Sequence, residues 1–152
     1  MSDVRNPRVL VCDDDADIRT VVGLNLGLVG IDFGEASSGE EALNLLSDQE
    51  WHAIVLDLIM PGGDGMEVLK QLRDRSTKDL AIVVLSARNS PQAALRAFKL
   101  GAHAHVTKPF SPVALAHLLE ELIAMTHSER EARRLGSVER ASRLERMGMP
   151  TI

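Results

Sequence analysis

The feature that most constrains the fold is a short apolar run that ends in a single carboxylate. Residues 53–56 read AIVL, Asp57 follows, and Pro61-Gly62-Gly63 interrupts the chain soon afterwards. Apolar runs of this length, bounded by Pro and Gly, are typical of strands buried on both faces of a parallel sheet. Chemistry in open α/β sheets gathers at the carboxyl ends of the strands, which makes Asp57 a candidate reactive group. An Asp at such a position can also simply cap a turn.

The rest of the chain alternates between short apolar runs and segments with helical spacing. Strands are predicted at residues 8–13, 30–36, 52–57, 80–86 and 102–107. Helices are predicted from Asp14 or Asp15 to Leu28, from Ser38 to Leu46, and at residues 64–75, 91–100 and 111–125. This alternation predicts an α/β domain with a doubly wound, five-stranded parallel sheet and five flanking helices.

Composition narrows the class of protein. The 152 residues are 45% hydrophobic and 26% charged, which is typical of a globular chain with one domain and some length left over. The net charge of −5 argues against nonspecific binding to nucleic acid. No apolar stretch reaches membrane-spanning length, and residues 1–7 lack a signal-peptide core, so we expect a cytoplasmic protein that does not engage membranes. The single Cys12 is expected to be a buried, inert thiol.

Residues 126–152 differ in character from the domain before them. They contain six arginines and four glutamates, with only scattered apolar residues. Their spacing is too irregular for a coiled-coil seam, and Gly136 interrupts it. Two interpretations stay open. The segment is either a solvated helical tail, or it is a helical linker that once led to another domain of a larger protein, or a dimerising segment.

Four predicted strands end in chemically useful groups. Asp13 and Asp14 follow the first strand, Asp57 ends the third, Ser86 ends the fourth and Lys108 follows the fifth. Parallel strands bring these ends to one edge of the sheet, where crowded carboxylates favour a hard cation such as Mg²⁺. An Asp beside such a cation can attack phosphorus and form an aspartyl phosphate, whose oxygens a lysine and a hydroxyl can then bind.

These segments resemble the receiver domain of two-component response regulators. The resemblance covers about residues 7–125 and rests on four segments: VLVCDDD, LDLIMPGGDG, VVLSA and GAHAHVTKPF. It implies a flavodoxin-like fold. It also implies that Asp57 is the phosphoacceptor, and that Mg²⁺, or alternatively Mn²⁺, is bound by Asp13, Asp14, Asp57 and the backbone carbonyl of Ile59.

The remaining site residues are also implied by the resemblance. Lys108 and Ser86 take the positions that stabilise the phosphoryl group, and the Lys108–Pro109 peptide bond is expected to be cis. The family's switch pair falls on Ser86 and His105, where most members have an aromatic residue in place of the histidine. His105 could turn inward like that aromatic or make the switch sensitive to pH, or it could be a half-buried histidine that barely changes.

Two further departures from the family pattern lead to predictions. Ile59 and Arg88 occupy the positions that tune autodephosphorylation, and neither is a water-positioning carboxylate or amide, so we predict a long-lived phosphoryl state. The segment AHAH lacks the acidic residues with which the winged-helix branch forms its receiver dimer, so that dimer is not expected. The other histidines lack metal-ligand spacing and are predicted to be surface or edge residues: His52, His103, His117 and His127.

The resemblance implies a phosphorylation switch that turns over no external substrate. The phosphodonor would be a histidine kinase or a histidine phosphotransfer protein. The fourth helix, last strand and fifth helix would present a changed surface to an effector, and the C-terminal helix could form a homodimer. Two alternatives remain: an interaction module that ignores phosphate, and a haloacid-dehalogenase-type phosphohydrolase, for which Asp13-x-Asp15 has the right spacing but the Gly-Thr expected next is replaced by Ala16-Asp17.

Overall fold

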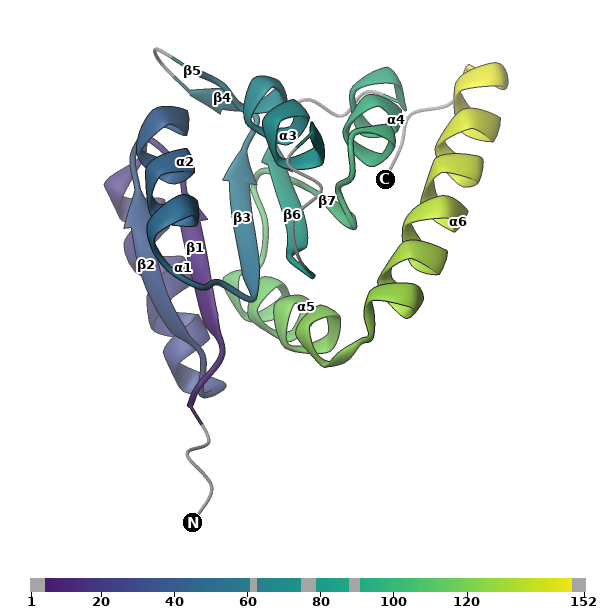
Figure 1. Ribbon diagram of the computed structural model, residues 1–152. Helices are drawn as coiled ribbons and strands as arrows, with labels where there is room; N and C mark the ends of the chain where they lie inside the picture. Colours follow the sequence, from purple (N-terminus) through teal and green to yellow (C-terminus); the bar gives the residue numbers. More distant parts are fainter. Residues whose placement is uncertain (1–4, 61–62, 75–78, 88–90, 149–152) are drawn as a thin grey trace.

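The computed structural model describes residues 5–60, 63–74, 79–87 and 91–148 (Figure 1). Its strands are β1 (Arg8–Cys12), β2 (Asp32–Ala36), β3 (Ala53–Asp57), β4 (Ile59–Met60), β5 (Gly63–Asp64), β6 (Ala81–Ser86) and β7 (Ala104–Thr107). Its helices are α1 (Ala16–Leu28), α2 (Gly39–Asp48), α3 (Gly65–Asp74), α4 (Pro91–Lys99), α5 (Pro112–Ala124) and α6 (His127–Arg146).

Five strands form one parallel sheet in the order β2-β1-β3-β6-β7. The predicted fold class is therefore confirmed. The register aligns Cys12 of β1 with Leu56 of β3, and Ser86 of β6 with Thr107 of β7. Because all strands run in one direction, the residues that follow them come together at a single edge of the sheet.

Alternate residues of the central strands pack two separate cores. Residues such as Val9, Val55 and Val83 face α1 and α5, where Leu26 and Leu119 complete the packing. Their sequence neighbours face the opposite side, where α2, α3 and α4 supply apolar residues. This two-residue alternation explains why the central strands are apolar at every position, as the sequence predicts.

Side-chain caps fix where several helices begin. Asp15, not Asp14, caps α1 by accepting a hydrogen bond from the backbone N–H of Asp17. Ser38 caps α2 and Ser111 caps α5 in the same way, with bonds from residues three positions on. Thr126 and Glu129 form a reciprocal capping box at the start of α6. Such caps satisfy N–H groups that have no partner inside the helix.

The structure adds one pair of strands to the predicted elements. Residues 59–60 and 63–64, expected to belong to a loop and to the start of a helix, pair as the short antiparallel strands β4 and β5. The tail, expected to be helical, forms α6, and this helix packs beside α4 in Figure 1, which was not predicted. Among the described residues, no helix combines the length and apolarity needed to cross a bilayer.

Candidate functional site

Three carboxylates meet at the edge where the strands end. Asp13 directly follows β1 and Asp57 is the last residue of the neighbouring strand β3, so the parallel register places them side by side. One carboxylate oxygen from each of Asp13, Asp14 and Asp57 lies within 4.8 Å of the others. Asp13 and Asp57 are buried, whereas Asp14 is exposed. The group is thus accessible from solvent on one side only.

Backbone N–H groups orient the two buried carboxylates. Oδ1 of Asp13 accepts a hydrogen bond of 2.9 Å from the N–H of Asp15, and Oδ1 of Asp57 accepts one of 3.0 Å from the N–H of Ile59. Each bond reaches two residues along the chain, the spacing of an Asx turn. These bonds leave the second oxygen of each carboxylate available for other partners.

Lys108 supplies the positive charge between the two acids. Its Nζ lies 2.9 Å from Oδ2 of Asp13 and 3.3 Å from Oδ2 of Asp57. Burial raises the pKa of the Asp57 carboxyl, as does the Asp13 charge, while the Ile59 N–H and Lys108 oppose the rise. Burial is the largest single influence on the pKa of Lys108 and lowers it, but the hydrogen bonds to Asp13 and Asp57 and the charges of these two acids together outweigh burial and leave that pKa above its ordinary value. Lys108 therefore stays charged.

The chain around Lys108 connects the site to the edge of the sheet. The Lys108–Pro109 peptide bond is cis, as the family resemblance implies. The N–H of Lys108 donates to the carbonyl of Ser86 at 2.9 Å, which extends the β6–β7 pairing by one residue. Ser86 itself is buried at the end of β6. The side chain of Ile59 is 53% exposed, and Arg88 lies outside the described residues.

His105 sits in the middle of β7, opposite Val84 of β6. Its ring meets the ring of Phe98 in α4 edge to face, with centroids 6.5 Å apart. Its Nε2 is buried and has no hydrogen-bond partner within the described residues. Burial lowers the pKa of His105, so the ring is neutral at neutral pH. In this structure His105 thus contacts α4.

One histidine prediction is wrong. His103, expected to be a surface or edge residue, stands beside the edge strand β7 but is 5% exposed. Its Nδ1 accepts a 3.0 Å hydrogen bond from the N–H of Ile82, and α6 covers its outer side through Glu131. The sequence gives no sign of that cover, because Glu131 lies in the segment without an apolar pattern. His52, His117 and His127 are exposed as predicted.

Sequence reasoning overlooked Arg19 and Gly65. Arg19 reaches from α1 to donate a 2.7 Å bond to the carbonyl of Asp13 and pairs with Glu35 at 3.0 Å. The sequence signal that could have identified Arg19 is its helical spacing from the acidic residues 13–15. Gly65 begins α3 against β3, and a Cβ there would lie 2.5 Å from the carbonyl oxygen of Asp57. Cys12 is buried as expected, and burial with the nearby acids raises its pKa to about 12.

The chain is similar to many proteins of one family. A family model described as the response regulator receiver domain matches residues 9–120. The phosphate regulon transcriptional regulatory protein PhoB of Escherichia coli is 38% identical over 109 residues, which are 71% of this chain and 48% of that protein. The probable transcriptional regulator ycf27 of Porphyridium aerugineum is 37% identical over 112 residues, or 74% of this chain and 46% of that one. The chain thus spans about half the length of the curated relatives it matches.

Solved structures agree with this assignment. The receiver domain of the Francisella response regulator 1452 superposes with a TM-score of 0.74 at 36% identity, covering 78% of this chain and 97% of that one. The BeF3-activated DrrB receiver domain gives 0.71 at 26% identity, covering 79% and 99%. The chain therefore belongs to the response regulator receiver domain family, whose members are phosphoacceptor switches in two-component signalling.

Proposed function

We propose that Asp57 is the phosphoacceptor of this chain. The observation that carries the proposal is the position of its carboxylate: buried at the end of a central strand, oriented by the Ile59 N–H and paired with Lys108. Asp13 shares that lysine and is also oriented by a backbone N–H, but it follows β1 and does not end the central strand β3, and Asp14 is exposed. Of the three acids, Asp57 alone combines fixed orientation with the strand-end position at which the family carries its acceptor.

The three carboxylates fit a hard divalent cation. All donors are oxygens, and one carboxylate oxygen from each residue already lies within 4.8 Å of the others, so that a small movement would bring the three onto one Mg²⁺. Asp13, Asp14, Asp57 and the backbone carbonyl of Ile59 would bind Mg²⁺, or Mn²⁺ with the same ligands. When bound, such a cation neutralises the acids and the phosphoryl oxygens so that the two can approach.

The chain's own residues then divide the work of phosphoryl transfer. A carboxylate oxygen of Asp57 forms a bond to phosphorus, while the bond from phosphorus to the donor imidazole breaks and its electron pair stays on that ring nitrogen. Lys108 binds a phosphoryl oxygen in place of its present contacts with the two acids. Ser86, at the same edge, donates its hydroxyl to another phosphoryl oxygen.

The partners follow from this role. The donor is a histidine kinase or a histidine phosphotransfer protein, and the reader is an effector domain or protein that binds the surface formed by α4, β7 and α5. We place the protein in the cytoplasm, with residues 1–7 as an extension, 8–125 as the receiver and 126–152 as the tail. A homodimer through the C-terminal helix is a further candidate assembly. No turnover of an external substrate is proposed.

The direct test is phosphorylation by a small-molecule donor. Acetyl phosphate with Mg²⁺ should add one phosphoryl group to the wild-type chain, as seen by intact mass. Asp57→Asn, which keeps the shape of the side chain, should abolish the adduct, and so should chelation of Mg²⁺. Asp48→Asn, at an exposed position in α2, is the matched control and should react normally.

Two results would replace the proposal. Absence of an adduct, under conditions where a control receiver reacts, would favour the phosphate-independent interaction module. Sustained hydrolysis of a phosphomonoester would favour the phosphohydrolase. That second alternative has little support from the geometry, because Asp15, its expected acid, caps α1 with its side chain.

A further inference from the structure

Helix α6 covers part of the surface that the proposed effector would read. It lies along α4 at the β7 edge of the sheet (Figure 1). We infer that α6 is an intramolecular occupant of this surface, docked in the unphosphorylated protein and released when Asp57 is phosphorylated. The inference rests on the proposed function of Asp57 and extends it by naming what the switch moves.

A small apolar cluster joins the two helices. Ala94, Leu95 and Phe98 of α4 pack together with Ala141 of α6, and the partly buried Val138 packs against them. These α4 residues are therefore hidden while α6 is docked. Release of α6 would expose them as an apolar surface on α4, which is the kind of surface that an effector protein can bind.

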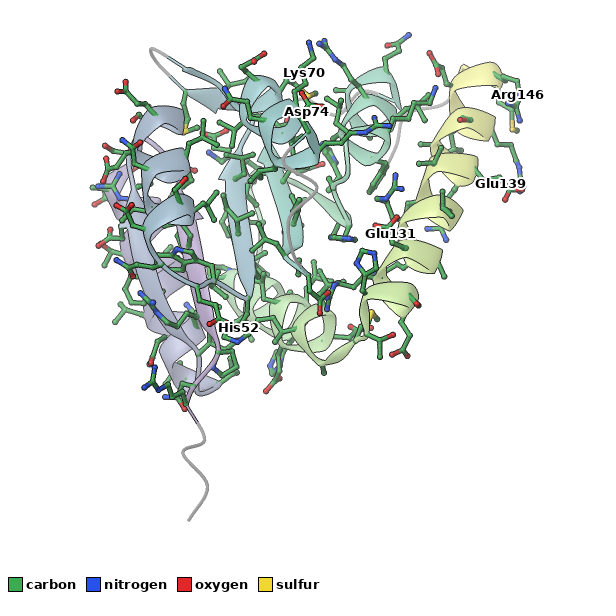
Figure 2. All side chains as sticks on the ribbon, in the orientation of Figure 1. His52, Lys70, Asp74, Glu131, Glu139 and Arg146 are labelled. Carbon is green, nitrogen blue, oxygen red and sulfur yellow. The ribbon has the colours of Figure 1, made fainter. Side chains whose placement is uncertain are left out.

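Polar contacts hold the first half of α6 in place. Arg134 donates a 2.9 Å hydrogen bond to the carbonyl of Phe98 in the last turn of α4, and also pairs with Glu131 at 2.8 Å. Glu131 in turn faces Nε2 of His103 at 3.5 Å. Figure 2 shows Glu131 on the side of α6 that faces the sheet, and Glu139 on the opposite side.

The buried Arg130 fixes the point about which α6 can move. It donates hydrogen bonds of 2.8 and 2.6 Å to the carbonyls of Leu122 and Met125 at the end of α5, and it pairs with Asp79. These contacts tie the first turn of α6 to α5 and to the start of β6. Beyond that turn, Arg133 forms an exposed pair with Glu121 of α5 at 3.4 Å, and the other contacts named here join the helix to α4 and to the edge of β7.

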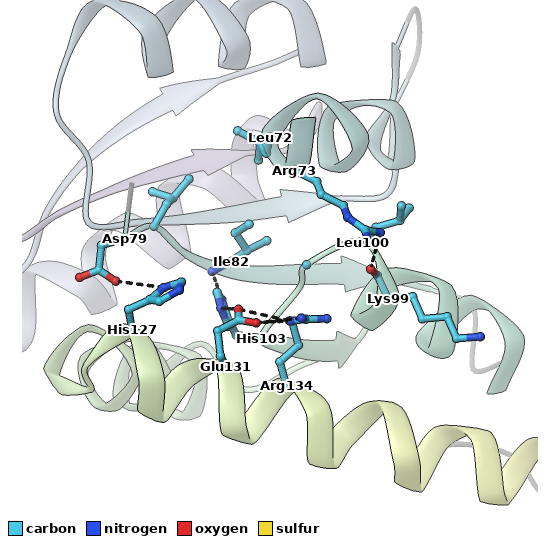
Figure 3. A pocket seen from close by; sticks show the side chains of 12 residues that line it. Leu72, Arg73, Asp79, Ile82, Lys99, Leu100, His103, His127, Glu131 and Arg134 are labelled. Atoms are coloured by element: carbon cyan, nitrogen blue, oxygen red, sulfur yellow. Dashed lines mark hydrogen bonds and ion pairs between the residues drawn. The ribbon is translucent and has the colours of Figure 1, made fainter. Parts of the chain in front are cut away.

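The docked interface is small enough to open. Of the twenty residues of α6, only Arg130 and Ala141 are buried. A cleft of about 570 Å³ lies where α6 faces the starts of β6 and β7, and Figure 3 shows His103, His127 and Glu131 along it. The apolar area that docking buries is correspondingly limited, and such segments open at low free-energy cost. The capping box and the Glu139–Arg143 pair help α6 to remain helical once detached.

β7 connects this interface to the phosphoacceptor. Lys108, just after the strand, binds Asp57, while His103, just before it, faces Glu131 of α6. Between them, His105 contacts Phe98, which also belongs to the apolar cluster with Ala141. Movement of Lys108 from Asp13 to a phosphoryl oxygen would be transmitted along β7 to the rings of His105 and Phe98. The surface that now fits α6 then fits it less well, so phosphorylation favours release.

Hydrogen exchange of the full chain tests the inference. Beryllofluoride with Mg²⁺, used as the phosphoryl mimic, should speed exchange of backbone amides in residues 91–99 and 131–146. Unchanged exchange in both segments, with the mimic bound at Asp57, would overturn the release of α6 and leave the proposed function intact. Failure of the mimic to bind at all would overturn both.

Matched variants test the same coupling from the other side. Ala141→Arg and Val138→Arg place a charge in the apolar cluster and should undock α6, whereas Ala132→Arg makes the same change at an exposed position. Because coupling is reciprocal, the two docking variants should bind beryllofluoride at least about 5-fold more tightly than wild type. Circular dichroism confirms that each variant is folded. Wild-type affinity in both folded docking variants would overturn the coupling.

Discussion

Nζ of Lys108 donates a hydrogen bond of 2.9 Å to Oδ2 of Asp13, a residue that lies 95 positions earlier in the chain. The bond crosses the sheet, because Asp13 follows β1 while Lys108 follows the edge strand β7. It neutralises a carboxylate whose side chain is only 1% exposed. The acids of the site are therefore compatible with folding before any cation or phosphoryl group is present.

Removal of this lysine should destabilise the fold and make it depend on divalent cations. Lys108→Met leaves two buried carboxylates without their counter-charge, at an expected cost of about 1–3 kcal/mol in the free energy of unfolding. Mg²⁺ should restore more stability to the variant than to the wild type. Urea denaturation with and without Mg²⁺ measures both effects.

Lys70→Met is the control for that experiment, since Lys70 is exposed on α3 (Figure 2). It should leave both the stability and the response to Mg²⁺ unchanged. Equal stability of Lys108→Met and Lys70→Met would show that the carboxylates do not need the ammonium.

Asp57→Asn should stabilise the protein at neutral pH. The pKa of Asp57 is raised in the folded state above its ordinary value of 3.8, chiefly by burial. Its ionised form therefore costs stability, and this cost is absent below pH 3.8 and appears as the pH rises through the folded pKa. Asn removes the cost and still accepts the Ile59 N–H. Urea denaturation across this range should show a gain that shrinks as the pH falls.

His105, the neutral histidine in β7, should make the free energy of unfolding decrease as the pH falls. The pKa of His105 is lowered by burial from 6.5, so its contribution is fully present above that pH and is lost as the pH falls through the folded pKa. His105→Phe keeps a ring against Phe98 and removes the unpartnered nitrogen. It should raise stability by about 1 kcal/mol and flatten the acid limb of the profile.

His117→Phe provides the comparison for His105→Phe, because the His117 side chain is 62% exposed. Melting temperatures at several pH values between 5 and 8 would separate the two variants. A profile for His105→Phe that falls as steeply as that of His117→Phe would assign the acid sensitivity to the buried His103 instead.

Replacement of glycine by alanine is expected to lower stability at Gly65 and to raise it at Gly136. Gly65→Ala would place a methyl group 2.5 Å from the Asp57 carbonyl oxygen and 2.6 Å from Cα of Leu58, which are backbone atoms that cannot step aside. A loss of about 1–3 kcal/mol is expected. Gly136→Ala meets nothing within 4 Å inside α6 and should stabilise that helix by about 0.5–1 kcal/mol. Thermal denaturation measures both effects, and equal melting temperatures for the two variants would contradict the predicted clash at Gly65.

The phosphorylated protein should lose its label slowly. Ile59, beside the acceptor, offers no group that could orient an attacking water, and its exposed side chain can be replaced without disturbing the core. Ile59→Gln introduces such a group and should accelerate loss of the phosphoryl label, while Leu28→Gln, at a side chain that is 83% exposed, should not. Rapid loss from the wild type would contradict the prediction.

The sequence predicted the sheet well because each central strand has a recognisable local sequence pattern. Residues 53–57 and 81–86 are apolar at nearly every position and are bounded by breaks, and all of them are buried. The strand ends follow from the same runs, which is why Asp13, Asp57, Ser86 and Lys108 could be assigned to one edge. The β4–β5 pairing was missed because two-residue strands carry no period.

The docking of α6 could not be predicted for a different reason. Only Ala141 and Val138 enter the apolar cluster, and an alanine and a valine among ten charged residues do not form a recognisable apolar stripe. The contacts that place the helix are long-range and polar, such as Arg134 with the Phe98 carbonyl. The burial of His103 depends on the same contacts, so it was missed together with them.

The close approach of Gly65 to Asp57 also makes the site asymmetric. On that side, helix α3 begins with backbone touching backbone, so there is no gap into which the acceptor segment could relax. On the other side stand a flexible lysine side chain, a four-residue edge strand and a lightly attached helix. A phosphoryl group on Asp57 therefore cannot displace the backbone on the α3 side. Any displacement that it causes occurs on the other side of the site, toward β7 and α6 at the edge of the sheet.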